Sequence, residues 1–282
     1  MTLFEVIVLS LLQGALELFP VSSLGHTVLI PALLGWNADR TDPSFLALVV
    51  MLHFGTATAL LAFFWRDWLA ITVGVLRSLV RRRLSDDPDE RLGWLILIGS
   101  VVPGFFGVVL KDAVGGLLGR ASIVAFFLIV NGLVMLAGER VRARTTDEEG
   151  LRLGELPFRT GFIVGASQAL ALIPGFSRAG VSMVAGLQAR LDHVGAARFS
   201  FLLATPLIVG ATMISVEDLF APEALVAPSH VLIGYLISVA TALISLKFMM
   251  RFFETERLDI FGYYCIVVGA AALAILGVGG TL

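Results

Sequence analysis

The stretch "QGALELFPVSSLGH", residues 13–26, places an amide, a carboxylate, two serines and a histidine inside an apolar part of the chain. Polar groups are costly in lipid, so such a cluster indicates a functional site rather than an ordinary membrane span. Pro20 lies in its middle and breaks a helix, because proline lacks a backbone donor. We therefore interpret the stretch as a turn between two short helices.

A second stretch resembles the first. "ALALIPGFS" at 169–177 aligns with "ALELFPVSS" at 15–23, at an offset of 154 residues, and at an offset of 155 Gly55 aligns with Gly210. These matches predict an internal repeat within a single membrane domain, residues 1–282. The predicted repeats are approximately residues 1–140 and 158–282.

The composition is that of a membrane protein. The chain has 282 residues, 57% of them hydrophobic and 15% charged, with a mean hydropathy of +0.92. Soluble domains carry about 25% charged residues, so we expect a polytopic membrane protein with no nucleic-acid partner. The single cysteine, Cys265, excludes an intrachain disulfide. The N-terminus carries Glu5 and lacks the basic region of a signal peptide, so we expect it to be mature protein.

Six apolar runs are long enough, at about 20 residues, to cross a bilayer roughly 30 Å thick. These predicted spans are 45–65, 92–111, 121–138, 199–216, 231–250 and 261–280. The segments 3–35 and 160–190 contain the proline motifs and are interpreted as re-entrant helix pairs. The fold class is therefore an all-α polytopic protein, an inverted repeat of one re-entrant pair plus three transmembrane helices. The amphipathic segment 68–84 is expected to lie at the membrane interface.

The basic residues favour this topology. With both broken segments re-entrant, the loops on one side carry 16 Lys and Arg residues and those on the other side carry three. If 160–190 crossed the membrane, the division would be 11 against 8. The basic side is expected to be cytoplasmic. Because each half has three crossings, the second half is inverted, and the two turns should meet near mid-membrane, where such proteins place substrate sites.

The residues around the two turns predict an anion site. Gln13 and Glu17 are four residues apart and share a helix face. Glu17 needs a cavity or a partner at membrane depth. Arg178 lies in the second broken segment, and its planar guanidinium suits bidentate phosphate binding. Helix N-termini after the two turns also favour an anion, so we predict phosphate where the turns meet.

A carboxylate beside phosphate is repulsive unless a divalent cation bridges them, so Gln13 and Glu17 are predicted to be ligands of Mg²⁺ or Ca²⁺. A serine hydroxyl could attack phosphorus, with His26 as general acid or base. Structural alternatives stay open. Ser22 could only cap a helix, His26 could be a core histidine, and Glu17 with Arg178 could be a structural pair. We expect a packing or hydrogen-bonding role for His53.

At these residues the sequence resembles the undecaprenyl-pyrophosphate phosphatase family of the bacitracin-resistance type. The first motif of that family reads approximately (E/Q)-x-x-x-E followed by F-x-P-V-S-S-T-G-H, and "QGALELFPVSSLGH" matches it. The second reads approximately P-G-x-S-R-S-x-x-T and corresponds to "PGFSRAGVS" at 174–182. Length, motifs and spacing fit, so the similarity covers essentially the whole chain.

The resemblance implies a divalent-metal-dependent hydrolase that removes one phosphate from undecaprenyl pyrophosphate. The product, undecaprenyl phosphate, is the lipid carrier for peptidoglycan and other cell-wall polymers. The resemblance also implies a multi-pass protein of the bacterial inner membrane, with a site reached from the periplasmic side. Ser23 is expected to be the nucleophile and His26 the proton shuttle, with His26 as the alternative nucleophile. The residues carried over are Glu17, Ser23, His26 and Arg178 as catalytic, Ser22, Ser177, Arg178 and Ser182 as pyrophosphate-binding, and Gln13 and Glu17 as metal ligands.

Three positions depart from the family pattern. Leu24 replaces threonine and Ala179 replaces serine, so neither position is expected to carry indispensable chemistry. Ser182 replaces threonine and keeps a hydroxyl that could donate to phosphate. Gln13 is within the variation of the family, but as a neutral ligand it should hold a cation more weakly than glutamate.

Other functions and assemblies stay open. Inverted repeats with broken helices also occur in secondary transporters, so the alternative is a lipid-phosphate flippase or transporter. An integral phosphatase of the acid-phosphatase type is disfavoured, because Val184 stands where its pattern requires histidine. The small residues at 269–272 and in "GVGG" at 277–280 permit close helix packing within one protomer or in a homodimer.

Overall fold

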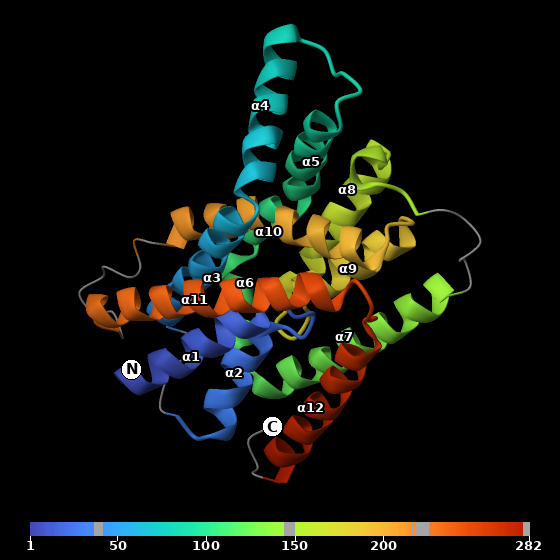
Figure 1. The fold of residues 1–282 in the computed structure, drawn as a ribbon. Helices are drawn as coiled ribbons and strands as arrows, with labels where there is room; N and C mark the ends of the chain where they lie inside the picture. Colours follow the sequence, from blue (N-terminus) through green and yellow to red (C-terminus); the bar gives the residue numbers. More distant parts are fainter. Residues whose placement is uncertain (37–41, 144–149, 216, 218–225, 279–282) are drawn as a thin grey trace.

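The computed structural model describes residues 1–36, 42–143, 150–215, 217 and 226–278. Within these ranges the chain forms helices and no strands (Figure 1). The α-helices are α1 (Leu3–Leu16), α2 (Ser23–Leu33), α3 (Pro43–Phe63), α4 (Trp65–Arg81), α5 (Pro88–Val109), α6 (Lys111–Leu118), α7 (Ala121–Ala143), α8 (Phe158–Ser167), α9 (Arg178–Gln188), α10 (His193–Ser215), α11 (Pro228–Phe252) and α12 (Asp259–Val278). Two short 3₁₀ helices are η1 (Leu153–Glu155) and η2 (Gln168–Leu172).

The prediction of an all-α membrane protein with six candidate spans is confirmed. In the described chain, α3, α5, α7, α10, α11 and α12 are long and apolar enough to cross a membrane. Several begin before the apolar run, because helices start at polar caps. For example, α5 begins after Asp87, whose carboxylate accepts from the backbone N–H of Asp89 and Glu90. The predicted span ends at 216 and 280, and Arg40 of the charge count, lie outside the described residues.

Helices α4 and α5 form a hairpin that projects from the other helices (Figure 1). α4 follows α3 after a break at Phe64 and packs along the first half of α5. A Cβ on Gly74 would lie 2.9 Å from the Glu90 backbone, so the two helices approach closely there. The Trp94 indole donates a hydrogen bond to the Ser78 hydroxyl at 2.8 Å. The amphipathic segment is thus helical, and its place at a membrane interface stays a prediction.

Each proline motif interrupts a helix as expected. α1 ends at Leu16, and α2 begins after Ser22, whose backbone is left-handed at φ 64°. In the second segment, Gly175 has φ 106°, and a Cβ there would lie 2.4 Å from the Val124 carbonyl oxygen. Only glycine fits that turn without moving α7. The two broken segments are therefore α1–turn–α2 and α8–η2–turn–α9.

The helix contacts between the two halves of the chain come in matching pairs. α1 packs on α11 and α8 packs on α5, while α3 packs on α11 and α10 packs on α5. α2 contacts α12 and α9 contacts α7, and the pairs α3–α10 and α7–α12 join the halves directly. If the halves are exchanged, the first six of these pairs become one another, and α3–α10 and α7–α12 each map onto themselves. In this arrangement α5 and α11 occupy equivalent places.

Glycines let several of these helices touch through their backbones. A Cβ on Gly165 of α8 would lie 2.2 Å from the Cα of Gly99 in α5, and one on Gly132 of α7 would lie 2.5 Å from the Gly262 carbonyl oxygen in α12. Such small-residue contacts replace the hydrophobic effect as the basis of helix association in lipid. Gly269 lies against the Ala125 carbonyl oxygen in the same α7–α12 interface. Of the small residues at 269–272, Gly269 and Ala272 are therefore buried within the chain, whereas Ala270 and Ala271 are exposed.

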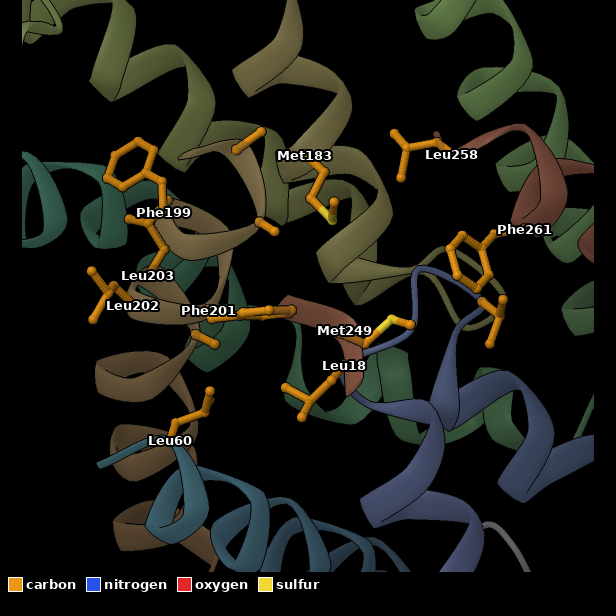
Figure 2. Packing of buried hydrophobic residues seen from close by; sticks show 14 of the residues in the cluster. Leu18, Leu60, Met183, Phe199, Phe201, Leu202, Leu203, Met249, Leu258 and Phe261 are labelled. Atoms are coloured by element: carbon orange, nitrogen blue, oxygen red, sulfur yellow. The ribbon is translucent and has the colours of Figure 1, made fainter. Parts of the chain in front are cut away.

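The apolar core surrounds the first turn. Leu18 of this turn, Phe201 of α10 and Met249 of α11 are fully buried members of one cluster (Figure 2). The ring of Phe19 lies 5.7 Å from that of Phe261 in α12, between ring centroids. The turn is thus held by helices of the second half.

Gly165→Leu is expected to destabilise the protein, because its Cβ would meet the backbone of Gly99, which cannot move aside as a side chain can. The measurement is the thermal unfolding temperature in detergent. Gly116→Leu is the matched control, since nothing lies within 4 Å of a Cβ there. Equal unfolding temperatures for the two variants would contradict the α5–α8 contact.

Candidate functional site

The two turns meet at Asn131, a fully buried residue of α7. Its Nδ2 donates to the Pro20 carbonyl oxygen at 3.1 Å, and its Oδ1 accepts from the Ser177 backbone N–H at 3.0 Å. One amide thus binds the backbone of both proline motifs. Gly180, in the first turn of α9, is small enough to lie close to both Asn131 and Pro20.

A buried ion pair joins the same two segments. An Arg178 Nη2 donates to Glu17 Oε1 at 2.6 Å, and the two side chains are 14% and 6% exposed. The other terminal nitrogen of Arg178, Nη1, is buried and has no hydrogen-bond partner. The arginine therefore holds Glu17 with one nitrogen and has a second donor available for a ligand.

The other carboxylate oxygen of Glu17, Oε2, is surrounded by three groups. Gln13 Nε2 donates to it at 2.9 Å, and the Ser23 hydroxyl donates to it across a short contact. His53 Nε2 lies 3.2 Å away. His53 Nδ1 donates to the Val49 carbonyl oxygen at 2.7 Å, so Nε2 faces the carboxylate. Two acceptors would repel at this distance, and a proton must therefore lie between His53 and Glu17.

These groups line one end of a cavity of about 450 Å³. Its polar lining includes Glu17, Ser23, His53 and Arg178, and the rest is mainly apolar. Ser22 and Ser177 also line it. A volume of this size lies within the range of about 300–1,000 Å³ that is usual for small-molecule sites.

Ser22 and Ser177 have equivalent positions at the starts of α2 and α9. Each accepts a hydrogen bond from the backbone N–H three residues on, at 3.1 Å in both cases. Ser22 therefore caps α2, and Ser177 caps α9 in the same way, and a further role for either hydroxyl stays a prediction. Capping uses the oxygen as acceptor and leaves the O–H free to donate. The two helix N-termini that flank the cavity favour an anion there.

Three predicted site residues, Gln13, His26 and Ser182, lie outside the cavity lining, and Gln13 is buried behind Glu17. His26 Nδ1 donates to the Ser22 carbonyl oxygen at 2.8 Å, and its Nε2 lies 3.0 Å from the Tyr264 hydroxyl, with the two rings stacked. The Ser182 hydroxyl donates to the Arg178 carbonyl oxygen at 2.7 Å and lies 2.7 Å from the Ser200 hydroxyl. The structure thus places His26 against α12 and Ser182 against α10.

The predicted metal ligands suit a cation that phosphate would help to coordinate. Gln13 Oε1 is buried without a hydrogen-bond partner, one helical turn from the Glu17 carboxylate. In the described part of the chain, His, Cys, Asp and Glu side chains form no group of three or more that could hold a metal. Mg²⁺ sites in phosphate-binding proteins commonly use one or two carboxylates with phosphate oxygens and waters. The Glu17 carboxylate lines the cavity, whereas Gln13 turns its Nε2 toward Glu17, so its Oε1 would join a shared cation only after the amide rotates.

Sequence reasoning did not assign His53, Asn131 or Tyr264 to the site. The polar side chain of His53 within an apolar run was the available signal, since such residues at membrane depth are usually functional. Asn131 gave the same signal in the third predicted span. Tyr264 gave none, because tyrosine is common near membrane interfaces.

The fold and this site define a class. The chain is a polytopic α-helical membrane protein with a cavity whose polar groups come from two broken helical segments. A comparison with protein families agrees. The family model described as "Bacitracin resistance protein BacA" matches residues 6–271, and the chain belongs to this family.

Curated relatives resemble the chain over nearly its whole length. The Undecaprenyl-diphosphatase of Mycolicibacterium paratuberculosis is 43% identical, with 95% of each chain covered. The Undecaprenyl-diphosphatase 2 of Chromobacterium violaceum is 42% identical, over 97% of this chain and 98% of that protein. The Undecaprenyl-diphosphatase of Acidiphilium cryptum is 42% identical, over 99% of this chain and 100% of that protein.

Asn131→Leu is expected to destabilise the protein, because it leaves the Pro20 carbonyl and the Ser177 N–H buried without partners. Each unsatisfied buried group costs about 1–3 kcal/mol. Cys265→Ala is the control, since it removes the weak contact of the Asn131 amide with sulfur at 3.5 Å and a small amount of packing but leaves both turn contacts of Asn131 in place. Thermal unfolding in detergent compares the two variants. A loss no larger for Asn131→Leu than for Cys265→Ala would contradict a structural link through Asn131.

Proposed function

We propose that this chain hydrolyses undecaprenyl pyrophosphate to undecaprenyl phosphate and inorganic phosphate, and so recycles the lipid carrier for cell-wall synthesis. The observation that carries the proposal is the meeting of Ser23, Glu17 and Arg178, from the two proline motifs, at one buried cavity. Relatives at 40% identity or more are named undecaprenyl-diphosphatases. A polyprenyl pyrophosphate matches the cavity, because its charged pyrophosphate suits the polar end of the cavity and its prenyl chain suits the apolar walls.

Pyrophosphate binding is assigned to groups whose donors face the cavity. The free Nη1 of Arg178 and the O–H groups of Ser22 and Ser177 would donate to phosphate oxygens. The N-termini of α2 and α9 add positive ends of two helix dipoles. Ser182 supports this binding by fixing the first turn of α9, through its bond to the Arg178 carbonyl oxygen.

The chemical step is assigned to Ser23 and Glu17. The Ser23 hydroxyl already donates to Glu17 Oε2, so the carboxylate is placed to accept the proton as the serine oxygen attacks the terminal phosphorus. The bond from that phosphorus to the bridging oxygen breaks, and undecaprenyl phosphate leaves with the electron pair. Water then hydrolyses the phosphoserine and inorganic phosphate is released. The proton that Glu17 accepted returns to the Ser23 oxygen.

His26 is proposed as the proton shuttle, which donates a proton to the leaving oxygen or accepts one from the attacking water, with nucleophilic attack by His26 as the alternative. It lies three residues after Ser23 in α2, within the first turn of that helix. To reach the cavity, its ring would have to leave the Tyr264 hydroxyl. This requirement makes His26 more suited to a later proton transfer than to the first attack.

His53 is proposed as the residue that orients Glu17. Its Nδ1–H bond to Val49 fixes the ring plane, and its Nε2 then fixes Oε2 beside Ser23. Arg178 fixes the other oxygen. The carboxylate is thus held from both sides in the position that attack by Ser23 requires.

A divalent cation, Mg²⁺ or Ca²⁺, is proposed to be held by Glu17 and Gln13 when pyrophosphate is bound. It would neutralise the charge that Glu17 and the phosphates bring together. The partnerless Oε1 of Gln13 supports this assignment.

The proposed topology is an inverted repeat in the bacterial inner membrane. Support comes from the exchange symmetry of the helix pairs and from the odd number of spans in each half. With the basic loops in the cytoplasm, the cavity-lining parts of α3, α5 and α10 belong to their periplasmic halves. The site would then open to the periplasmic side. Its named groups come from one chain, so the activity does not require the homodimer that small residues would permit.

The first test is phosphate release from undecaprenyl pyrophosphate by the purified protein in detergent. Ser23→Ala should lower kcat on the order of 10³-fold or more, as loss of a nucleophile does. Arg178→Ala should abolish turnover, and Arg178→Lys should recover a small part of it, because lysine keeps the charge without the fork. Ser10→Ala is the control, a buried serine of α1 whose hydroxyl bonds within its own helix.

Full activity of Arg178→Ala would refute the site. The flippase alternative makes a different prediction, namely movement of labelled undecaprenyl phosphate across liposomes without phosphate release. Phosphoserine trapped on the wild-type protein and absent from Ser23→Ala would identify the nucleophile. Persistence of the phosphoenzyme in Ser23→Ala but not in His26→Ala would assign attack to His26.

The cation is tested by chelation. Protein treated with EDTA should lose phosphate release and regain it with Mg²⁺ or Ca²⁺. Gln13→Glu should lower the cation concentration that gives half-maximal rate, since a carboxylate binds a hard cation more tightly than an amide, and Gln13→Leu should raise it. Undiminished turnover in EDTA would exclude the cation while leaving the phosphatase proposal standing.

A further inference from the structure

The cavity extends well beyond the polar groups at its inner end. Its walls continue along α5 and α10 to Val108 and Ile214, which line it and are 58% and 49% exposed. These residues lie near the C-terminal ends of α5 and α10, where Lys111 and Ser215 also line the cavity. The cavity therefore runs from the buried ion pair to the exposed ends of these two helices.

Gly210 of α10 keeps this cavity open. Nothing lies within 4 Å of the place where its Cβ would stand. Its repeat equivalent, Gly55 of α3, is different, because a Cβ there would lie 2.7 Å from the Ser238 Cβ and 2.9 Å from the Tyr235 carbonyl oxygen of α11. Gly55 thus serves helix packing, whereas Gly210 faces empty space.

The difference arises from α5 and α11, the helices with equivalent places in the two halves. α11 lies directly against Gly55, and its Tyr235 ring stacks on Phe54. α5 instead presents Gly104 and Gly107 to the cavity, where the nearest atoms to a Cβ are 3.7 and 3.8 Å away. The space next to Gly55 is thus filled by α11, whereas the equivalent space next to Gly210 is empty.

Polar groups at the inner end show that the hollow side is built for a ligand. Gln168 lines the cavity, is 2% exposed, and has an Oε1 without a hydrogen-bond partner. Arg178 Nη1 is likewise buried and without a partner. A ligand that enters the cavity would meet donors and an acceptor at the inner end and mainly apolar walls beyond it, with Ser100, Lys111 and Ser215 among them.

We propose that the apolar part of this cavity binds the isoprenoid units next to the pyrophosphate, and that Gly210 is a specificity-determining residue for the lipid chain. This inference rests on the proposed function and names the subsite that holds the chain. The occupant is the prenyl chain of the substrate itself, because the apolar walls are continuous with the polar end that would hold its pyrophosphate.

The size of the cavity limits what it recognises. A volume of about 450 Å³ suits a ligand of drug size rather than a complete long polyprenyl chain. The units nearest the pyrophosphate lie inside, and the distal units extend into the bilayer past Val108 and Ile214. The protein therefore contacts the isoprenoid units nearest the pyrophosphate, and its affinity does not depend on the length of the chain beyond them.

The test compares Gly210→Leu with wild type on undecaprenyl, farnesyl and dimethylallyl pyrophosphates, which share the head group and differ in chain. Gly210→Leu should raise KM on the order of tenfold for the two longer substrates, because leucine fills space that the chain needs. KM for dimethylallyl pyrophosphate should change less than threefold, as should kcat for all three. Gly116→Leu is the matched control, an open glycine of α6 outside the cavity.

Equal KM changes for the long and short substrates, or no change for any of them, would overturn the chain subsite. Should Gly210→Leu be inactive on all three, a second measurement on wild type decides. A farnesyl pyrophosphate analogue with a photoreactive group in its first isoprene unit should label 104–108 of α5 and 207–214 of α10. Labelling confined to other segments would overturn the inference. Absence of phosphate release by wild type would refute the proposed function, and labelling would still report on the subsite.

Discussion

A carboxylate buried at membrane depth has to find a cation or hydrogen-bond donors, because the surrounding hydrocarbon offers neither. Glu17 finds Arg178 on one oxygen, and Gln13, Ser23 and His53 on the other. Since Arg178 belongs to the other broken segment, neither half satisfies its buried charge fully without the other. The positions of α2 and α9, the opening of the cavity and the placement of Ser23 all depend on this contact.

Asn131 reinforces that contact at the level of the backbone. Its amide holds the Pro20 carbonyl and the Ser177 N–H, so the turns meet through main-chain groups as well as through side chains. The serines at the helix starts have their capping bonds formed already. Groups that would bind phosphate are thus in place before the ligand arrives, which lowers the cost of ordering them.

The sequence predicted the features that depend on local signals. Apolar length predicted the six candidate spans, proline predicted the breaks, and the repeat indicated that "IPGFS" is the counterpart of "FPVSS". His53 and Asn131 were missed because their roles depend on which face of α3 or α7 meets the turns, and nearly featureless apolar helices do not reveal a face. The outward turn of His26 toward Tyr264 depends on a contact 238 residues apart. The empty space at Gly210 was equally hidden, since Gly55 carries the same residue in the equivalent place.

The ion pair also bears on how the protein is made. Arg178 follows Glu17 by 161 residues, so the carboxylate enters the membrane well before its arginine has been synthesised. His53 and Gln13 belong to the same first half and both reach Glu17 without help from the second. They give the nascent chain a local set of partners during insertion, and the arginine joins that set once the later helices assemble. The first half can thus fold before Arg178 is available, without leaving the Glu17 carboxylate unpaired in lipid.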